Sequence, residues 1–384
     1  MAERVARLRA VLDPQASTLG GIPAFDMAAA HDLYAKVLAP VEAGWKGSKN
    51  LLVVAHGPLG HLPLALLPTQ TVSVDQKALP LFAGYKAVPW LARTHAVTNL
   101  PSVAALRALR SVPAPAVERR AFAGFGDPWF RPEHAAPVPQ QQTAQVTSRG
   151  ALALRGFPVT LRSAPQTRAV DSADLARLPR LAETAEELKS IALALNADPT
   201  TAVFTGKKAS EGVVKTMDLS GVRVLAFATH GLVPGDLDGL TQPALALSAP
   251  GVTGETEDGL LTLGEILGLR LDADWVVPSA CNTGSADGAG AEAVSGLGRA
   301  FFYAGSRALL VSNWPVETTS AKLLTTELFR QQSQTPELAR AEALRRSMLA
   351  LIDGPGFIAG GKAVFSYAHP IFWAPFSVVG DAGV

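Results

Sequence analysis

The second half of the chain alternates short apolar runs with amphipathic segments, and this alternation limits the possible folds more than any other feature. The apolar runs predict strands at residues 201–206, 223–231, 273–281, 307–316 and 372–380. The segments between them predict helices at residues 182–195, 208–217 and 292–305. Strands that alternate with helices form a mostly parallel sheet covered on both faces, with ligands bound beyond the carboxyl ends of the strands. We therefore expect an α/β protein.

The rest of the chain is less regular. Residues 1–46 have apolar residues at helical spacing and predict a helical lead-in, whereas the apolar block Leu51 to Ala55 predicts a strand buried on both faces. Residues 131–179 are rich in Pro, Gln, Ser and Thr, which indicates a surface excursion or a seam between two halves. Thr318 to Ile352 reads as one long helical stretch, and the residues between His230 and the next helix read as a looped excursion.

Composition excludes several classes of function. Apolar residues make up 48% of the 384 residues and charged residues 17%, with a net charge of +1, so neither disorder nor nucleic-acid binding is favoured. The single cysteine cannot form an intramolecular disulfide or a Cys-rich zinc site, which indicates a reducing compartment such as the cytoplasm. No apolar signal core or membrane-spanning run is present, and no residue cluster has zinc-ligand spacing. We expect a soluble protein with no metal, cofactor or membrane association.

That single cysteine, Cys281, follows a predicted strand and precedes a Gly-containing turn. His230 also ends a predicted strand, and Gly231 follows it. A thiolate nucleophile needs a nearby base and backbone donors for an oxyanion, and the N–H of a glycine approaches a substrate readily. His230 lies 51 positions before Cys281, close to the separation of about 50 residues found in caspases. The combination favours a Cys/His dyad.

Plainer interpretations stay open. A lone cysteine is commonly a small buried apolar residue, and a histidine before glycine at a strand end is commonly part of a turn. Near the predicted dyad, Asp258 is a candidate acid for a basic substrate pocket, as are Asp236, Asp238 and Glu257, although acids in a loop are more often solvated. Trp314 and Glu317 follow another predicted strand. They are candidates for a pocket wall, or else a packed Trp and the acid that starts a helix.

Several motifs carry a family resemblance. The runs "LAFATHG", "VVPSACNTG", "GAEAVSGLGRAFFYAGSRALLVSNWPV" and "HPIFWAPFSVVG" resemble, in order and spacing, the CHAT domain, a bacterial caspase-like family related to separase. "NLLVVAHGPLGHLPLALLP" extends the resemblance into the first half, to roughly residues 30–384. It implies a caspase-like three-layer α/β/α sandwich. In that fold, residues 47–180 form a degenerate half and residues 181–384 a catalytic-like half.

The resemblance also implies site residues and an activity. His230 and Cys281 match the catalytic pair, and the backbone N–H groups of Gly231 and Cys281 match the oxyanion donors of a thiol endopeptidase. As in caspases, a backbone carbonyl is expected to orient His230. In several members that cleave after Arg or Lys the residue two before the cysteine is acidic. Here it is Ser279, which leaves basic specificity unsupported.

Members of the family commonly carry helical TPR repeats ahead of the domain. We therefore expect a protein or peptide substrate and an activating sensor partner, TPR-type or other, in bacterial signalling or defence. Either the sensor is a separate protein or this chain is a piece of a longer TPR-containing protein. Two alternatives remain: a catalytically silent caspase-like binding module, and a thiol hydrolase acting on small acyl substrates.

Overall fold

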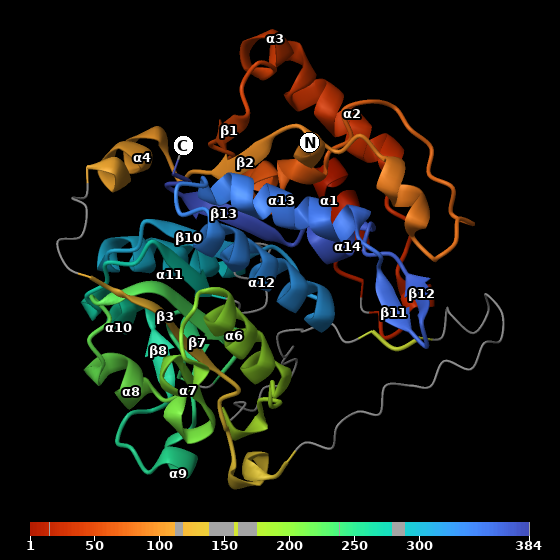
Figure 1. The fold of residues 1–384 in the computed structure, drawn as a ribbon. Helices are drawn as coiled ribbons and strands as arrows, with labels where there is room; N and C mark the ends of the chain where they lie inside the picture. The colour runs from red at the N-terminus through yellow and green to blue at the C-terminus, as the bar shows by residue number, and fades with distance from the viewer. Residues whose placement is uncertain are drawn as a thin grey trace.

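The computed structural model describes residues 1–14, 16–111, 118–137, 157–159, 175–237, 239–278 and 289–383, with backbone only for 289–295. Its centre is an eight-stranded sheet in the order β1-β2-β13-β10-β9-β5-β3-β4 (Figure 1). The strands are β1 Asn50–Val53, β2 Ala96–Asn99, β3 Arg120–Gly126, β4 Val203–Thr205, β5 Val222–Ala228, β9 Trp275–Pro278, β10 Ala308–Ser312 and β13 Phe376–Gly380. Neighbours pair in parallel except β10 with β13, which confirms the mostly parallel sheet.

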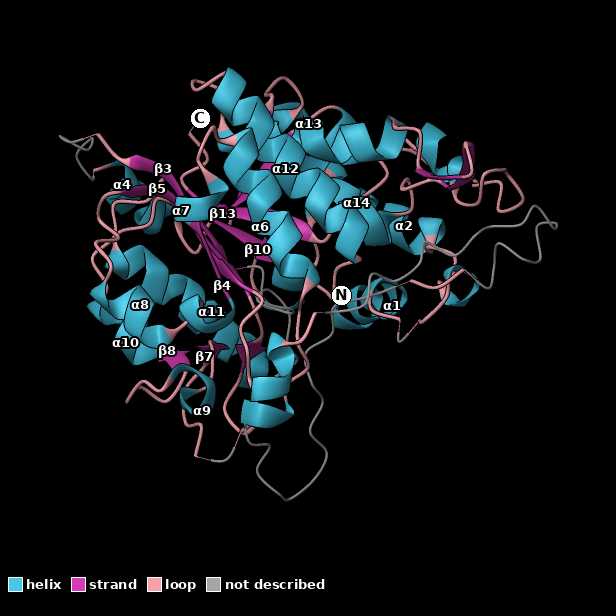
Figure 2. Ribbon diagram, turned by 60° about the horizontal axis from the view of Figure 1, so that its bottom comes forward, coloured by secondary structure: helices cyan, strands magenta, loops and turns pink. Residues whose placement is uncertain are grey.

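Alternating side chains along the strands enter two different apolar cores. In β5, Val224, Ala226 and Ala228 belong to one core, and Leu225 and Phe227 belong to the other. Because successive side chains of a strand point to opposite faces, each face of the sheet carries its own core. Helices cover both faces (Figure 2), so the predicted three-layer α/β/α fold class is confirmed.

The first core is closed by α1, α2, α6, α12, α13 and α14, and the second by α8, α10 and α11. The helices are α1 Ala2–Leu12, α2 Met27–Val37, α3 Glu42–Trp45, α4 Val103–Arg110, α6 Glu183–Ala194, α7 Pro199–Ala202, α8 Glu211–Thr216, α9 Pro250–Thr253, α10 Leu263–Gly268, α11 Ala289–Ala304, α12 Thr318–Gln334, α13 Arg340–Asp353 and α14 Pro370–Trp373. None of the helices in the described residues combines the length and apolar character needed to cross a bilayer.

The one long helix expected from Thr318 to Ile352 is two helices, α12 and α13. The break contains Pro336, which has no N–H to donate to a helix and disfavours the helical conformation at Thr335 before it. Thr335 accordingly leaves the helix with φ −138° and ψ 82°. The two helices then pack against each other on the same face of the sheet.

The looped excursion expected after His230 contains a small antiparallel sheet of β6 Gly231–Leu232, β7 Ala244–Ala246 and β8 Leu260–Thr262. Strands of two or three residues are too short to show a periodic pattern, so the sequence did not predict them. A second hairpin pairs β11 Phe357–Ala359 with β12 Lys362–Phe365. Much of the predicted excursion at 131–179 lies outside the described residues, and its described part contains the short 3₁₀ helices Pro132–Ala135 and Leu175–Arg177.

The predicted divisions at residues 46 and 180 do not correspond to separate sheets. Helices α1, α2 and α3 lie within residues 1–46, and the first two contribute Leu8 and Leu33 to the first core. Strand β3, from the predicted first half, lies between β5 and β4 of the predicted second half. One continuous sheet joins the two segments, and the division into a degenerate half and a catalytic-like half stays a prediction.

Candidate functional site

His230 lies just beyond the carboxyl end of β5 and immediately before β6. Its main chain is fixed on the small sheet, because its carbonyl accepts a hydrogen bond of 2.9 Å from the Ala246 N–H and the Thr229 hydroxyl donates to the Ala246 carbonyl. The residue is only 1% exposed. The predicted location at a strand end is therefore confirmed, and the imidazole is held inside the protein.

The two ring nitrogens of His230 have different surroundings. Nε2 lies 2.8 Å from the carbonyl oxygen of Pro179, and Nδ1 is buried with no hydrogen-bond partner among the described residues. A carbonyl oxygen can only accept, so Nε2 carries the hydrogen, and in the neutral ring Nδ1 then has a free lone pair. This bond is the backbone carbonyl contact that was expected to orient His230.

Burial lowers the pKa of His230, and the bond to the Pro179 carbonyl opposes this effect without overcoming it. The Phe130 ring, with its centroid 5.8 Å from that of the imidazole, is part of the apolar surroundings. Desolvation disfavours the charged form of a histidine. The ring is therefore neutral at pH 7, in the state that accepts a proton.

Gly231 is the first residue of β6 and lies opposite Leu245 of β7. Pairs in an antiparallel ladder alternate between hydrogen-bonded and non-hydrogen-bonded types. The Ala246 N–H donates to the His230 carbonyl, so these two residues form a hydrogen-bonded pair. The next pair, Gly231 with Leu245, is therefore of the non-hydrogen-bonded type, and the Gly231 N–H points away from β7. This N–H is a donor beside His230 that the small sheet does not use.

Cys281 and Ser279 lie outside the described residues, as does Asp238. The last described residue before Cys281 is Pro278, which ends β9 and pairs with Phe227 of β5. Strands β5 and β9 are parallel neighbours, so their carboxyl ends meet at one edge of the sheet.

The candidate acids on the small sheet have local partners. Asp258 is exposed, and its Oδ1 accepts a hydrogen bond of 2.9 Å from the Leu260 N–H in the turn before β8. Asp236 is half-buried, and its carboxylate accepts a hydrogen bond of 2.8 Å from the Val233 N–H. Burial raises the pKa of Asp236. No described contact joins either carboxylate to His230. A role for Asp258 in a substrate pocket stays a prediction.

Trp314 and Glu317 have the contacts of structural residues. Trp314 is fully buried, and its Nε1 donates 3.2 Å to the Ile371 carbonyl. Glu317 caps α12, because its carboxylate accepts hydrogen bonds of 3.0 Å from the Thr319 N–H and 2.7 Å from the Ser320 N–H. The second of the two interpretations, a packed Trp and a helix-starting acid, accounts for both side chains.

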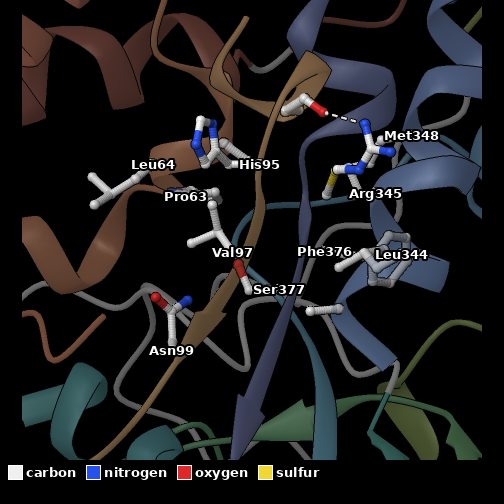
Figure 3. Close-up of a pocket in the computed structure, with 13 residues that line it drawn as sticks. Pro63, Leu64, His95, Val97, Asn99, Leu344, Arg345, Met348, Phe376 and Ser377 are labelled. Atoms are coloured by element: carbon white, nitrogen blue, oxygen red, sulfur yellow. Dashed lines mark hydrogen bonds between the residues drawn. The ribbon is translucent and has the colours of Figure 1, made fainter. Parts of the chain in front are cut away.

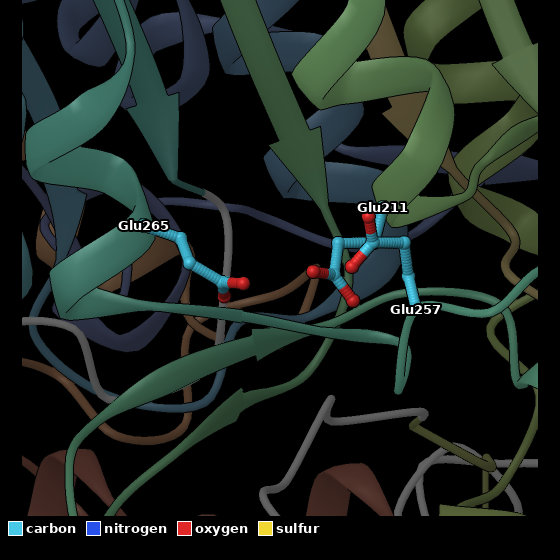
Figure 4. A group of neighbouring side chains, drawn as sticks. All are labelled: Glu211, Glu257 and Glu265. Carbon is cyan, nitrogen blue, oxygen red and sulfur yellow. The ribbon is translucent and has the colours of Figure 1, made fainter.

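Three glutamates, Glu211, Glu257 and Glu265, bring carboxylate oxygens within 4.8 Å of one another (Figure 4), a spacing that suits a metal ion. Lys215 Nζ, however, reaches all three carboxylates, at 3.1, 2.9 and 3.1 Å respectively. The ammonium supplies the positive charge that the carboxylates need, while burial raises the pKa of Glu211. The group is explained as an ion-pair network.

Two cavities among the described residues lie away from His230. A narrow one between β2, β13 and α13 is lined by residues including His95, Val97 and Arg345 (Figure 3), and its volume of about 20 Å³ suits one water molecule. A larger one of about 240 Å³ is lined by Arg223, Trp275 and Arg340. Arg223 and Trp275 lie at the amino ends of β5 and β9, the opposite ends from His230.

Comparison with known proteins identifies a family and finds similar solved structures, among them a cysteine proteinase. The model of the CHAT domain family matches residues 27–381. The crystal structure of gingipain R, an Arg-specific cysteine proteinase, is similar with a TM-score of 0.32 and 12% identity over 52% of this chain. The match spans about two fifths of that structure, 41% of its length. No curated protein matches the sequence.

Proposed function

Because the chain belongs to the CHAT domain family, we propose that it is a caspase-like cysteine endopeptidase that hydrolyses peptide bonds through His230 and Cys281. Cys281 is the nucleophile and His230 the base. The backbone N–H groups of Gly231 and Cys281 stabilise the oxyanion. No cofactor takes part in this reaction.

The register of the central sheet is the observation that supports the dyad most strongly. Pro278 pairs with Phe227 in the parallel ladder of β9 and β5. Cys281 comes three residues after Pro278, and His230 comes three residues after Phe227. Because equal numbers of residues follow paired positions on neighbouring parallel strands, this register supports the proposal that the cysteine and the histidine act together.

The state of the imidazole supports the assigned role. With Nε2–H bonded to the Pro179 carbonyl, Nδ1 offers a lone pair that takes the thiol proton as Cys281 Sγ attacks the substrate carbonyl carbon. His230 then gives this proton to the departing amine, which leaves an acyl-enzyme thioester. His230 takes a proton from the incoming water and returns it to the Cys281 sulfur as the carboxylic acid leaves.

The burial of His230 favours regulation of this activity. This residue is 1% exposed, so a substrate reaches Nδ1 only after the surroundings of the ring rearrange. A peptidase held latent until a sensor protein binds has such a site, and so does a catalytically silent binding module, which is the second candidate function. We propose the first, with a cytoplasmic bacterial role in signalling or defence that rests on the family resemblance.

The experiment uses the purified protein and its Cys281→Ala variant, each incubated with a peptide library and with acyloxymethyl-ketone probes that differ in the residue beside the warhead. Cleavage or labelling that disappears in the variant supports the peptidase and gives its side-chain preference. Absence of both, together with a Cys281 that small alkylating agents cannot modify, contradicts the peptidase and supports the binding module.

A further inference from the structure

The carbonyl that orients His230 belongs to a short segment, residues 175–181, which we call the Pro179 segment. Upstream of Pro179, Leu178 is 1% exposed and packs in an apolar cluster with Phe130 and Leu232. Leu232 belongs to β6, two residues beyond His230. One side of Pro179 is therefore fixed by apolar packing against the strand that begins beside the histidine.

The other side of Pro179 is fixed by charge. Arg180 Nε and Nη2 donate to the two carboxylate oxygens of Asp127, at 2.7 and 2.8 Å, and Nη1 donates to the Ala136 carbonyl at 2.9 Å. The two side chains are 19% and 7% exposed, so solvent screens the pair little. A bidentate pair of this kind fixes direction as well as distance, because two parallel hydrogen bonds define the plane of the guanidinium.

Asp127 is itself tied to the central sheet. It follows β3 directly, and its backbone is in the left-handed region with φ 45°. Its N–H donates a hydrogen bond of 2.7 Å to Thr184 Oγ1. The Thr184 hydroxyl in turn donates a hydrogen bond of 2.7 Å to the Leu181 carbonyl. The Asp127 carbonyl accepts a hydrogen bond of 3.0 Å from the Gly206 N–H. The acid is thus a fixed point on the strand next to β5.

We infer that the Asp127–Arg180 ion pair positions the base of the proposed peptidase: it holds the Pro179 carbonyl against His230 Nε2 and so keeps Nδ1 as the proton acceptor. This inference rests on the proposed function for its catalytic consequence. Neither residue contacts the reacting atoms, so both are positioning residues. An error of about 1 Å in such a contact lowers a rate by up to about a hundredfold.

Two variants test the inference. Asp127→Asn keeps the size and tolerates the left-handed backbone but removes the charge, and Arg180→Lys keeps the charge but loses the two-pronged contact. The matched control is Arg93→Lys. Arg93 makes a similar two-pronged contact to Asp353, at 2.8 and 3.1 Å, and donates 3.0 Å to the Val88 carbonyl, away from His230.

We expect both test variants to lower kcat by about tenfold to a hundredfold and to change KM by less than about twofold, with the control unchanged. The second measurement needs no turnover: ¹⁵N shifts of the ring nitrogens of His230, assigned by their loss in His230→Gln. The wild type should show one neutral tautomer with hydrogen on Nε2, and the test variants a mixture of tautomers.

A folded test variant with unchanged kcat and a single unchanged tautomer overturns the inference. If Asp127→Asn fails to fold, Arg180→Lys decides. The two readouts also separate this inference from the proposed function. A tautomer that depends on the ion pair, in a protein without peptidase activity, defeats the peptidase and leaves the positioning role standing.

Discussion

Pro278 of β9 lies opposite Phe227 of β5, and the predicted nucleophile Cys281 and the predicted base His230 each follow three residues later. The pairing is within the central sheet, where both strands are buried on both faces. The proposed dyad therefore depends on a register that apolar packing on both sides of the sheet maintains.

The pH dependence of the proposed peptidase activity follows from the surroundings of His230. Burial lowers its pKa below the ordinary value of 6.5, so the ring stays neutral and able to accept a proton to lower pH than an exposed histidine. We expect the acidic limb of kcat/KM to have its midpoint below pH 6.5, in a profile measured from about pH 5 to about pH 9. A midpoint above that value would contradict the assignment of His230 as the base.

A second buried histidine, His369, should make folding stability depend on pH. Its Nε2 donates a hydrogen bond of 3.1 Å to the Pro23 carbonyl, and its Nδ1 accepts one of 3.2 Å from the Ile371 N–H. Burial lowers its pKa to about 3. Its unfolded pKa is near 6.5, so the unfolded state binds more protons below that pH. Stability is then lost as pH falls, by about 1.4 kcal/mol per pH unit.

The His369→Asn variant tests this slope. Asparagine still accepts the Ile371 N–H at the start of α14 but does not titrate. The free energy of unfolding, measured with denaturant at about pH 7 and about pH 5, should fall less steeply toward acid in this variant than in the wild type. His56→Asn, at an exposed residue, is the control. Equal slopes in the wild type and in His369→Asn would show that His369 is not held neutral.

Gly305 connects α11 to β10 with φ 116°, and a Cβ added there would lie 2.1 Å from the Leu271 carbonyl oxygen. Both the backbone angle and the close contact exclude a side chain. We expect Gly305→Ala to lower the free energy of unfolding by about 3 kcal/mol. At Gly268 nothing lies within 4 Å of an added Cβ, so Gly268→Ala should change it by less than about 1 kcal/mol.

The Glu317→Ala variant distinguishes a structural role of this side chain from a role in the substrate pocket. Because its carboxylate caps α12, Glu317→Ala should lower stability by about 1 to 2 kcal/mol. The side-chain preference of peptide cleavage should not change. A variant of unchanged stability but altered preference would instead place Glu317 in the substrate pocket.

The parts of the fold that the sequence predicted are those in which local pattern and tertiary environment agree. The second-half strands β5, β9, β10 and β13 are mostly apolar runs because both sides of the sheet are covered, and an apolar run can be recognised without knowing its neighbours. The strand-end location of His230 follows from the same pattern. Pro336 alone could have predicted the break between α12 and α13. The apolar residues on both sides of it continue at helical spacing, which suggested a single helix.

The contacts that the sequence could not predict are long-range. A backbone carbonyl was expected beside His230, but any residue supplies one, and only the folded chain brings Pro179 within 2.8 Å. The Asp127–Arg180 pair joins the end of one strand to a segment 53 positions away and has no sequence pattern of its own. Trp314 and Glu317 followed a strand end as pocket residues would, but packing under α14 and capping of α12 use the same residue types.

The most direct test of the dyad uses the fact that Cys281 is the only thiol in the chain, so alkylation by iodoacetamide reports on it alone. If Nδ1 of His230 takes the thiol proton, the rate of alkylation near pH 7 should fall by about tenfold or more in His230→Gln. His56→Gln, which alters the other histidine that precedes a glycine in the same way, should leave the rate unchanged. Equal rates in the wild type and in folded His230→Gln would contradict the dyad.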